Sequence, residues 1–255
     1  MAPDIFEVEI ADGVARCTMN GSKMNALGEE LLYPLVDGLK RVLHDDKVRV
    51  IVLRGGEGNF CSGGDVGTMG EEMDPTYLNE NMRLANEVGF ELHEGPKPVI
   101  TEVDGWAVGG GMGLAMSSDL TYATERARFM MSFVRISIIP DLGSSYLLPL
   151  RVGLLKAKEL VFTGRVVEAD EALTLGIVNR VVPHEEIADE VMTVARKLAT
   201  RSPRMLAVAK RNMNMAHRTD LRTILDLEES IQPLMVLAPE HHRDIQKFME
   251  KKSEK

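Results

Sequence analysis

The chain has 255 residues, and 39 acidic against 30 basic side chains give a net charge of −9. This balance disfavours general nucleic-acid binding, no run reaches the ~20 apolar residues of a membrane span, and residues 1–10 lack a secretory signal. Cys17 and Cys61 are too few for a disulfide framework. We therefore predict a cytoplasmic globular protein that binds neither nucleic acid nor membranes.

Strand and helix patterns alternate through the first two-thirds of the chain. Two short runs, residues 6–10 and 14–19, flank an Asp-Gly turn and predict a β-hairpin. Apolar residues at helical spacing predict a helix over residues 27–43, with a kink or late start at Pro34. Further strands are predicted over 48–53, 98–108 and 119–123, and further helices over 75–93 and 113–118. This order favours an α/β core of parallel strands.

After residue 184 only helical patterns remain. Pro203 and Pro239 each stand where a helix is expected to begin, a position that tolerates proline. Four helices are predicted, over residues 185–200, 203–217, 221–236 and 239–252. We predict a core over residues 1–195 and a helical region over residues 196–255.

Two segments have the order strand, glycines, helix; they run from Val48 to Asp65 and from Pro98 to Gly113. Glycine at such a junction lets a ligand approach the backbone, and helix N-terminal amides attract negative charge. Tight turns or close packing would explain isolated glycines equally well. Neither segment has P-loop spacing, and the second lacks the third glycine of the dinucleotide fingerprint. Nucleotide binding is therefore weakly supported.

Several motifs, in order, resemble those of the crotonase family of enoyl-CoA hydratases and isomerases. They are Lys23-Met24-Asn25-Ala26-Leu27, Phe60-Cys61-Ser62-Gly63-Gly64-Asp65-Val66, Lys97 through Gly111, Ser118-Asp119-Leu120, and Leu160 through Asn179. The resemblance implies an α/β spiral of repeated ββα units with C-terminal helices. It also implies acyl-CoA binding and catalysis in residues 1–195, and oligomerisation and a lid in residues 196–255. The expected assembly is a homotrimer or a dimer of trimers.

The resemblance also implies a site. The backbone N–H groups of Gly64 and Gly110 would form an oxyanion hole for the thioester oxygen, where one donor is typically worth ~10²–10³ in rate. Substrate contacts would come from Lys23, Met24, Ala26, Ser62, Gly63, Asp65, Val66, Gly111 and Arg135. Coenzyme A would arrive with the acyl-CoA substrate, so no separate cofactor is expected. No metal is expected either, because the Cys and His residues lack ligand spacing.

The catalytic carboxylates depart from the hydratase pattern. Gly113 and Arg135 stand where hydratases of the family have their two glutamates. Asp141 instead lies in a segment that resembles isomerase members, where the acid faces the α and γ carbons. One such carboxylate can take a proton and return it, and an apolar pocket would raise its pKa. Alternatively, Asp141 caps the helix beginning near Gly143.

Some interpretations remain open at this stage. Arg135 could pair with Asp141, bind a polar group of the substrate, or lie on the surface. Met69, Met73 and Met82 could form a pliable acyl pocket or fill the core, and residues 66–79 could form a mobile lid.

The function that these motifs predict is movement of a C=C bond in an acyl-CoA. The reaction would convert a 3-enoyl-CoA to a 2-enoyl-CoA, or isomerise a substrate of the 1,2-epoxyphenylacetyl-CoA type. The alternatives are an enoyl-CoA hydratase, a hydrolase or a dehalogenase on the same scaffold, and a non-catalytic CoA-binding protein.

Overall fold

The computed structural model describes residues 4–56, 58–69 and 74–253. The chain divides into two compact units, residues 1–200 and residues 201–255. The boundary predicted after residue 195 falls inside helix α8 (Ile187–Ala199), which belongs entirely to the first unit.

The larger sheet of the first unit has six strands in the order β1-β2-β3-β4-β6-β9 among the described residues. The strands are β1 (Phe6–Ala11), β2 (Val14–Met19), β3 (Val50–Gly55), β4 (Val99–Val103), β6 (Leu120–Thr124) and β9 (Arg180–Val182). Only the β1–β2 pair is antiparallel in this sheet, and every later pair is parallel. The predicted hairpin and the predicted α/β core of parallel strands are both confirmed.

A smaller sheet has the order β5-β7-β8, in which β5 follows β4 along the chain, β7 follows β6, and β8 precedes β9. It contains β5 (Trp106–Val108), β7 (Arg128–Met130) and β8 (Val166–Glu168), and Cys61 bridges to Ala107 of β5. The single strand predicted over residues 98–108 is therefore wrong. Gly105 adopts φ +60° and turns the chain, so β4 and β5 enter different sheets.

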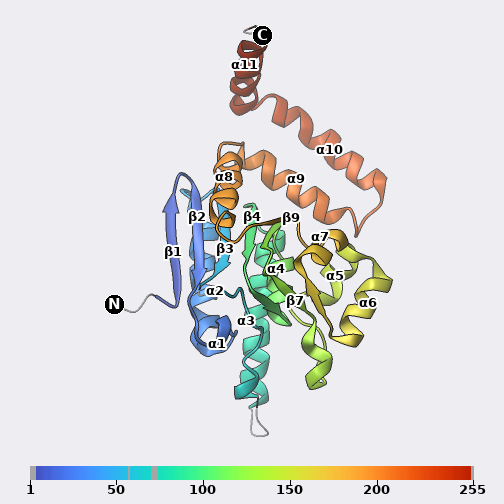
Figure 1. The fold of residues 1–255 in the computed structure, drawn as a ribbon. Helices are drawn as coiled ribbons and strands as arrows, with labels where there is room; N and C mark the ends of the chain where they lie inside the picture. Colours follow the sequence, from blue (N-terminus) through green and yellow to red (C-terminus); the bar gives the residue numbers. More distant parts are fainter. Residues whose placement is uncertain (1–3, 57, 70–73, 254–255) are drawn as a thin grey trace. The chain divides into compact units, whose positions relative to one another are not determined.

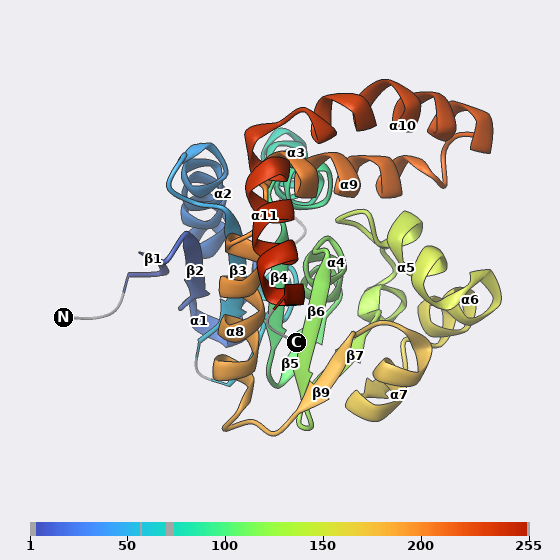
Figure 2. The same cartoon turned by 90° about the horizontal axis from the view of Figure 1, so that it is seen from above.

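Helices connect the strands of the first unit. They are α1 (Ser22–Asn25), α2 (Glu29–His44), α3 (Pro75–Glu94), α4 (Gly110–Met116), α5 (Ser144–Val152), α6 (Leu154–Thr163), α7 (Ala169–Leu175) and α8, with 3₁₀ turns η1 (Val66–Thr68) and η2 (Ser132–Ile136). Pro34 lies inside α2, which begins two residues later than predicted. Figures 1 and 2 both show α5, α6 and α7 gathered beside β7, at the end of the unit away from β1.

Both faces of the larger sheet carry buried apolar side chains. Helix α8 covers one face, where Val191 and Ala195 pack with Val52 of β3 (Figure 1). The other face, with Leu53 of β3, belongs to the main core together with α2, α3 and α4. Covering both faces with helices is typical of parallel sheets.

The predicted lid falls partly outside the described residues. Of residues 66–79, the structure describes η1, the residues next to it and the first turn of α3, while residues 70–73 lie outside the description. The proposal of a lid therefore stays a prediction.

The second unit contains helices and no strand among its described residues. It contains α9 (Pro203–Met215), α10 (Leu221–Val236) and α11 (Pro239–Ser253). Side-chain caps begin two of these helices, because Ser202 accepts from the Met205 amide and Asp220 accepts from the Thr223 amide. With α8, all four predicted C-terminal helices are confirmed. In the described ranges of the chain, no helix has the length and apolar character needed to span a bilayer.

Candidate active site

A pocket of about 400 Å³ opens at the glycine-rich junctions of the first unit. Its lining comes from four stretches of chain: Met24, Ala26, Ser62, Gly63, Gly64, Asp65, Val66, Met69, Val108, Gly109, Gly110, Ser132, Phe133, Arg135, Ile136, Ile138 and Asp141. The fold thus brings together nearly all of the residues predicted for the site. Two predicted residues are not among the lining. The side chain of Lys23 lies outside the described part of the structure, and Gly111 does not line this pocket.

The segment around α1 is fastened to the first glycine motif. The Ser62 amide donates to the Met24 carbonyl at 3.0 Å, and the Leu27 amide donates to the Gly63 carbonyl at 2.7 Å. The side chain of Asn25, which is buried, donates to the carbonyl of Phe60 at 3.2 Å. Met24 and Ala26 therefore reach the pocket because Asn25 ties their loop to it, a role that the Asn-Ala-Leu motif alone did not reveal.

The two glycine motifs pack backbone against backbone. Gly63 has φ +80°, and a Cβ there would lie 2.7 Å from the Val108 carbonyl oxygen. A Cβ on Gly111 would lie only 2.1 Å from the Cys61 carbonyl oxygen. Gly111 is therefore required for this packing, and its predicted contact with the substrate stays a prediction.

Gly64 and Gly110 present unengaged amides at this pocket. Within the described parts of the chain, neither backbone N–H has a hydrogen-bond acceptor, whereas the Gly63 amide donates to the Cys61 sulfur at 3.4 Å. The two amides come from different segments that the backbone packing holds together. Two fixed donors at one pocket are the arrangement that stabilises an oxyanion.

Asp141 supplies the pocket with an unusual carboxylate. Its Oδ1 is buried without a hydrogen-bond partner among the described residues, and burial raises the pKa of the side chain to about 6. Helix α5 begins at Ser144 with Gly143 as its N-cap, and within the described residues no amide of its first turn donates to the Asp141 carboxylate. The alternative that Asp141 caps this helix therefore gains no support.

A left-handed turn positions Asp141. The Ser144 amide donates to the Asp141 carbonyl at 2.8 Å, while Leu142 has φ +48° and Gly143 has φ +72°. Such a conformation is costly for leucine and persists only when packing enforces it. Leu142 is buried, and a Cβ on Gly110 would lie 3.1 Å from its Cδ1. Sequence reasoning missed Leu142, because nothing in its local pattern signals a positive φ.

Gly113, at the position of the first hydratase glutamate, packs against this same turn. A Cβ there would lie 2.7 Å from Ser144 Oγ and 3.0 Å from Leu142 Cβ. Ser144 is buried, and its hydroxyl has no hydrogen-bond partner among the described residues. The turn that carries Asp141 thus occupies the space that a side chain at Gly113 would need.

Arg135 lines the pocket but does not pair with Asp141. Its Nη2 donates to the Gly164 carbonyl at 3.0 Å, at the C-cap of α6. No carboxylate in the described residues forms an ion pair with it. Of the three uses considered for Arg135, pairing with Asp141 is therefore excluded in this structure.

The remaining candidate residues make contacts that are typical of structural roles. Asp65 lies in the pocket, but its Oδ1 accepts from the Gly67 amide at 3.1 Å, and Asp119 Oδ2 accepts from the Val99 amide at 2.7 Å. Burial raises the pKa of the Cys61 thiol to about 12, which keeps it protonated and poorly nucleophilic. Met69 lines the pocket, while Met73 lies outside the described residues. No cluster of potential metal ligands occurs in the described ranges.

Comparison with known proteins identifies the family of this chain. A sequence model of the family described as enoyl-CoA hydratase/isomerase matches residues 9–255. The chain is 33% identical over 250 residues to a 1,2-epoxyphenylacetyl-CoA isomerase of Escherichia coli (strain K12), which covers 96% of this chain and 95% of the relative. It is 35% identical over 217 residues to a short-chain-enoyl-CoA hydratase of Clostridium acetobutylicum, which covers 84% and 83%.

A solved structure extends the agreement to the fold. The crystal structure of an enoyl-CoA hydratase/isomerase from Cupriavidus metallidurans CH34 superposes with a TM-score of 0.90 and 32% identity, over 98% of this chain and 95% of that chain. The relatives carry both hydratase and isomerase names. The chain belongs to the enoyl-CoA hydratase/isomerase family of the crotonase superfamily, as an acyl-CoA-processing enzyme with the α/β spiral of that fold.

Proposed function

We propose that the protein shifts a C=C bond in an acyl-CoA, with Asp141 as its single acid and base. The observation that carries this proposal is the carboxylate of Asp141 in the pocket, whose Oδ1 is buried without a partner and whose pKa is raised to about 6. A carboxylate with this pKa is ionised at pH 7, yet its protonated form is readily reached during turnover.

The reaction follows from one carboxylate and two amides. Asp141 removes a proton from Cα of a 3-enoyl thioester, and the electron pair spreads over the conjugated chain to the thioester oxygen. The N–H groups of Gly64 and Gly110 would stabilise that oxygen. Asp141 then returns the proton at Cγ, which leaves a conjugated 2-enoyl thioester. No water and no second acid are consumed.

Hydration is the second candidate, favoured by the names of several relatives. Two-carboxylate hydration needs a further acidic group to manage the water. Gly113 offers no carboxylate, Arg135 offers a cation, and Asp65 is engaged by the Gly67 amide. The pocket therefore supports isomerisation better, and a related shift in a substrate of the 1,2-epoxyphenylacetyl-CoA type fits the same groups.

The proposal extends to the setting of the enzyme. Coenzyme A would enter only as part of the substrate, without a separate cofactor. The protein would work in the cytoplasm as a homotrimer or dimer of trimers, and the helical region would contribute subunit contacts and a lid. Sizing by light scattering and fractionation of cells test these points.

The decisive experiment uses 3-enoyl-CoA thioesters of short and medium chain. Formation of the conjugated product is followed by ultraviolet absorbance for the wild type and for Asp141→Asn, and crotonyl-CoA is supplied in parallel as a hydration substrate. Conversion by the wild type and its loss in Asp141→Asn would support the proposal. Rapid hydration of crotonyl-CoA, or binding of thioesters without conversion, would overturn it in favour of a hydratase or a binding protein.

A further inference from the structure

One wall of the pocket combines apolar side chains with a single cation. The wall is formed by η2 and the residues after it, where Phe133, Ile136 and Ile138 line the pocket together with Arg135. Of the described residues that line this pocket, only Arg135 carries a positive charge. A guanidinium is not needed to hold a purely hydrocarbon chain.

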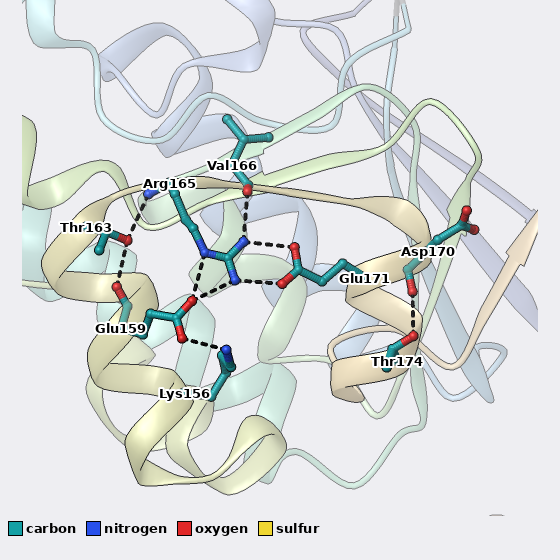
Figure 3. Close-up of polar contacts among 8 residues, drawn as sticks. All are labelled: Lys156, Glu159, Thr163, Arg165, Val166, Asp170, Glu171 and Thr174. Atoms are coloured by element: carbon teal, nitrogen blue, oxygen red, sulfur yellow. Dashed lines mark hydrogen bonds and ion pairs between the residues drawn. The ribbon is translucent and has the colours of Figure 1, made fainter.

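Two acidic side chains of α6 and α7 pair with a different arginine and not with Arg135. Glu159 and Glu171 both pair with Arg165, at 2.9 Å and 2.6 Å (Figure 3). Asp141 Oδ1 has no partner. One N–H of Arg135 donates to the Gly164 carbonyl, and a guanidinium has five N–H donors in all. The remaining N–H groups of Arg135 can donate to solvent or to a ligand.

The anchor of Arg135 is itself held firmly. Gly164 adopts φ +55°, and a Cβ there would lie 2.9 Å from Val134 Cγ1, so glycine is required for this approach. The next residue, Arg165, is fixed between α6 and α7 by its pairs with Glu159 and Glu171, as Figure 3 shows. A positioned guanidinium can select a planar carboxylate better than a mobile one.

Binding of an acyl chain in the pocket would remove water from Arg135. Arg135 is exposed to water in this structure, so its charge is solvated. An apolar acyl chain would displace that water without offering hydrogen-bond acceptors to the guanidinium. A carboxylate would replace the water with charge-assisted hydrogen bonds. Ionised Asp141 repels a second carboxylate close to it, so the acid must lie away from the reacting carbons.

We propose that Arg135 recognises a carboxylate at the far end of the acyl chain, so that the preferred substrate is the mono-CoA thioester of an unsaturated dicarboxylic acid. This inference rests on the proposed function, which places the acyl chain in this pocket and makes the substrate unsaturated. Its test is separate, because it measures the binding of saturated thioesters and not turnover.

The test compares two saturated, unreactive thioesters of equal length, hexanoyl-CoA and adipyl-CoA, by calorimetric titration. The wild type should bind adipyl-CoA roughly 10- to 100-fold more tightly, the range expected for a charged hydrogen-bonded contact. Arg135→Met should abolish this preference by weakening adipyl-CoA alone, and Arg135→Lys should retain part of it. Arg128→Met is the matched control, since Arg128 pairs with Glu168 and lies outside the pocket lining.

Two outcomes would overturn the inference. Equal affinity of the wild type for both thioesters would show that no acidic group is recognised. An equal loss of affinity for hexanoyl-CoA, adipyl-CoA and free CoA in Arg135→Met would assign Arg135 to the CoA moiety or to the packing of α6. If the separate assay showed no isomerisation, the proposed reaction would be wrong, but these titrations would still decide whether Arg135 binds a carboxylate.

Discussion

Asp141 and Glu171 are carboxylates of the same unit placed in opposite electrostatic surroundings. Asp141 has a buried Oδ1 without a partner, and burial raises its pKa to about 6. Glu171 accepts two hydrogen bonds from Arg165, which lower its pKa (Figure 3). The paired carboxylate is held as an anion and joins two helices. The unpartnered one can exchange a proton, so the surroundings and not the residue type separate a structural acid from a catalytic one.

The largest effect that would test this contrast is on turnover. Asp141→Asn should lower kcat for the proposed isomerisation by about 10³-fold or more, because the base is removed while the shape is kept. Stability at pH 8 should not fall, since an amide replaces a desolvated charge. Stopped assays and urea unfolding measure the two quantities. A kcat within tenfold of the wild type, or a marked loss of stability, would contradict the assignment.

The next effect concerns the missing glutamate. Gly113→Glu should destabilise the protein by about 1–3 kcal/mol, because its Cβ would overlap Ser144 and Leu142 beside the Asp141 turn. Urea unfolding checks this, and Gly113→Ala separates the effect of the Cβ from that of the carboxylate. Wild-type stability together with new hydration of crotonyl-CoA would show that the turn does not exclude a second acid.

A smaller effect is expected in the pH dependence of stability, to which Asp141 and Glu171 should contribute with opposite sign. For Asp141 the folded pKa, about 6, lies above the ~3.9 of an unfolded chain, so its contribution to stability falls as pH rises between these values. For Glu171 the folded pKa is lowered, so its contribution is lost as pH falls. The kcat/KM should rise with pH through about 6 as Asp141 ionises. A profile without an ionisation in this region would argue against Asp141 as base.

The smallest effect belongs to the paired network. Arg165→Met should cost about 1 kcal/mol or less, because its partners Glu159 and Glu171 are 40% and 39% exposed and solvent screens them. Thermal unfolding and the isomerase assay measure stability and kcat for this variant, and kcat should stay within about twofold. A loss of activity as large as that of Asp141→Asn would mean that the network controls the site directly.

The site was predictable where its residues lie in continuous motifs. Gly64, Gly110 and Asp141 were singled out from three separate segments, and the fold brings all three to one pocket. The surroundings of these residues were not predictable. The anchor of Arg135 is the carbonyl of Gly164, and the Asp141 turn depends on a left-handed Leu142 that packs against Gly110 and Gly113. These contacts join residues far apart in the chain, and local patterns carry no signal for them.

The sequence by itself determined the α/β order of the first unit, the hairpin, the helical C-terminal region and the family, because periodicity, proline placement and glycine motifs are local properties of the chain. Only the tertiary structure decided that residues 98–108 divide between two sheets at Gly105, and that Gly111 serves packing. It also decided which acid is free to take up a proton. The reason is physical: a pKa depends on excluded water and on neighbouring charges, and both are set by packing between distant segments.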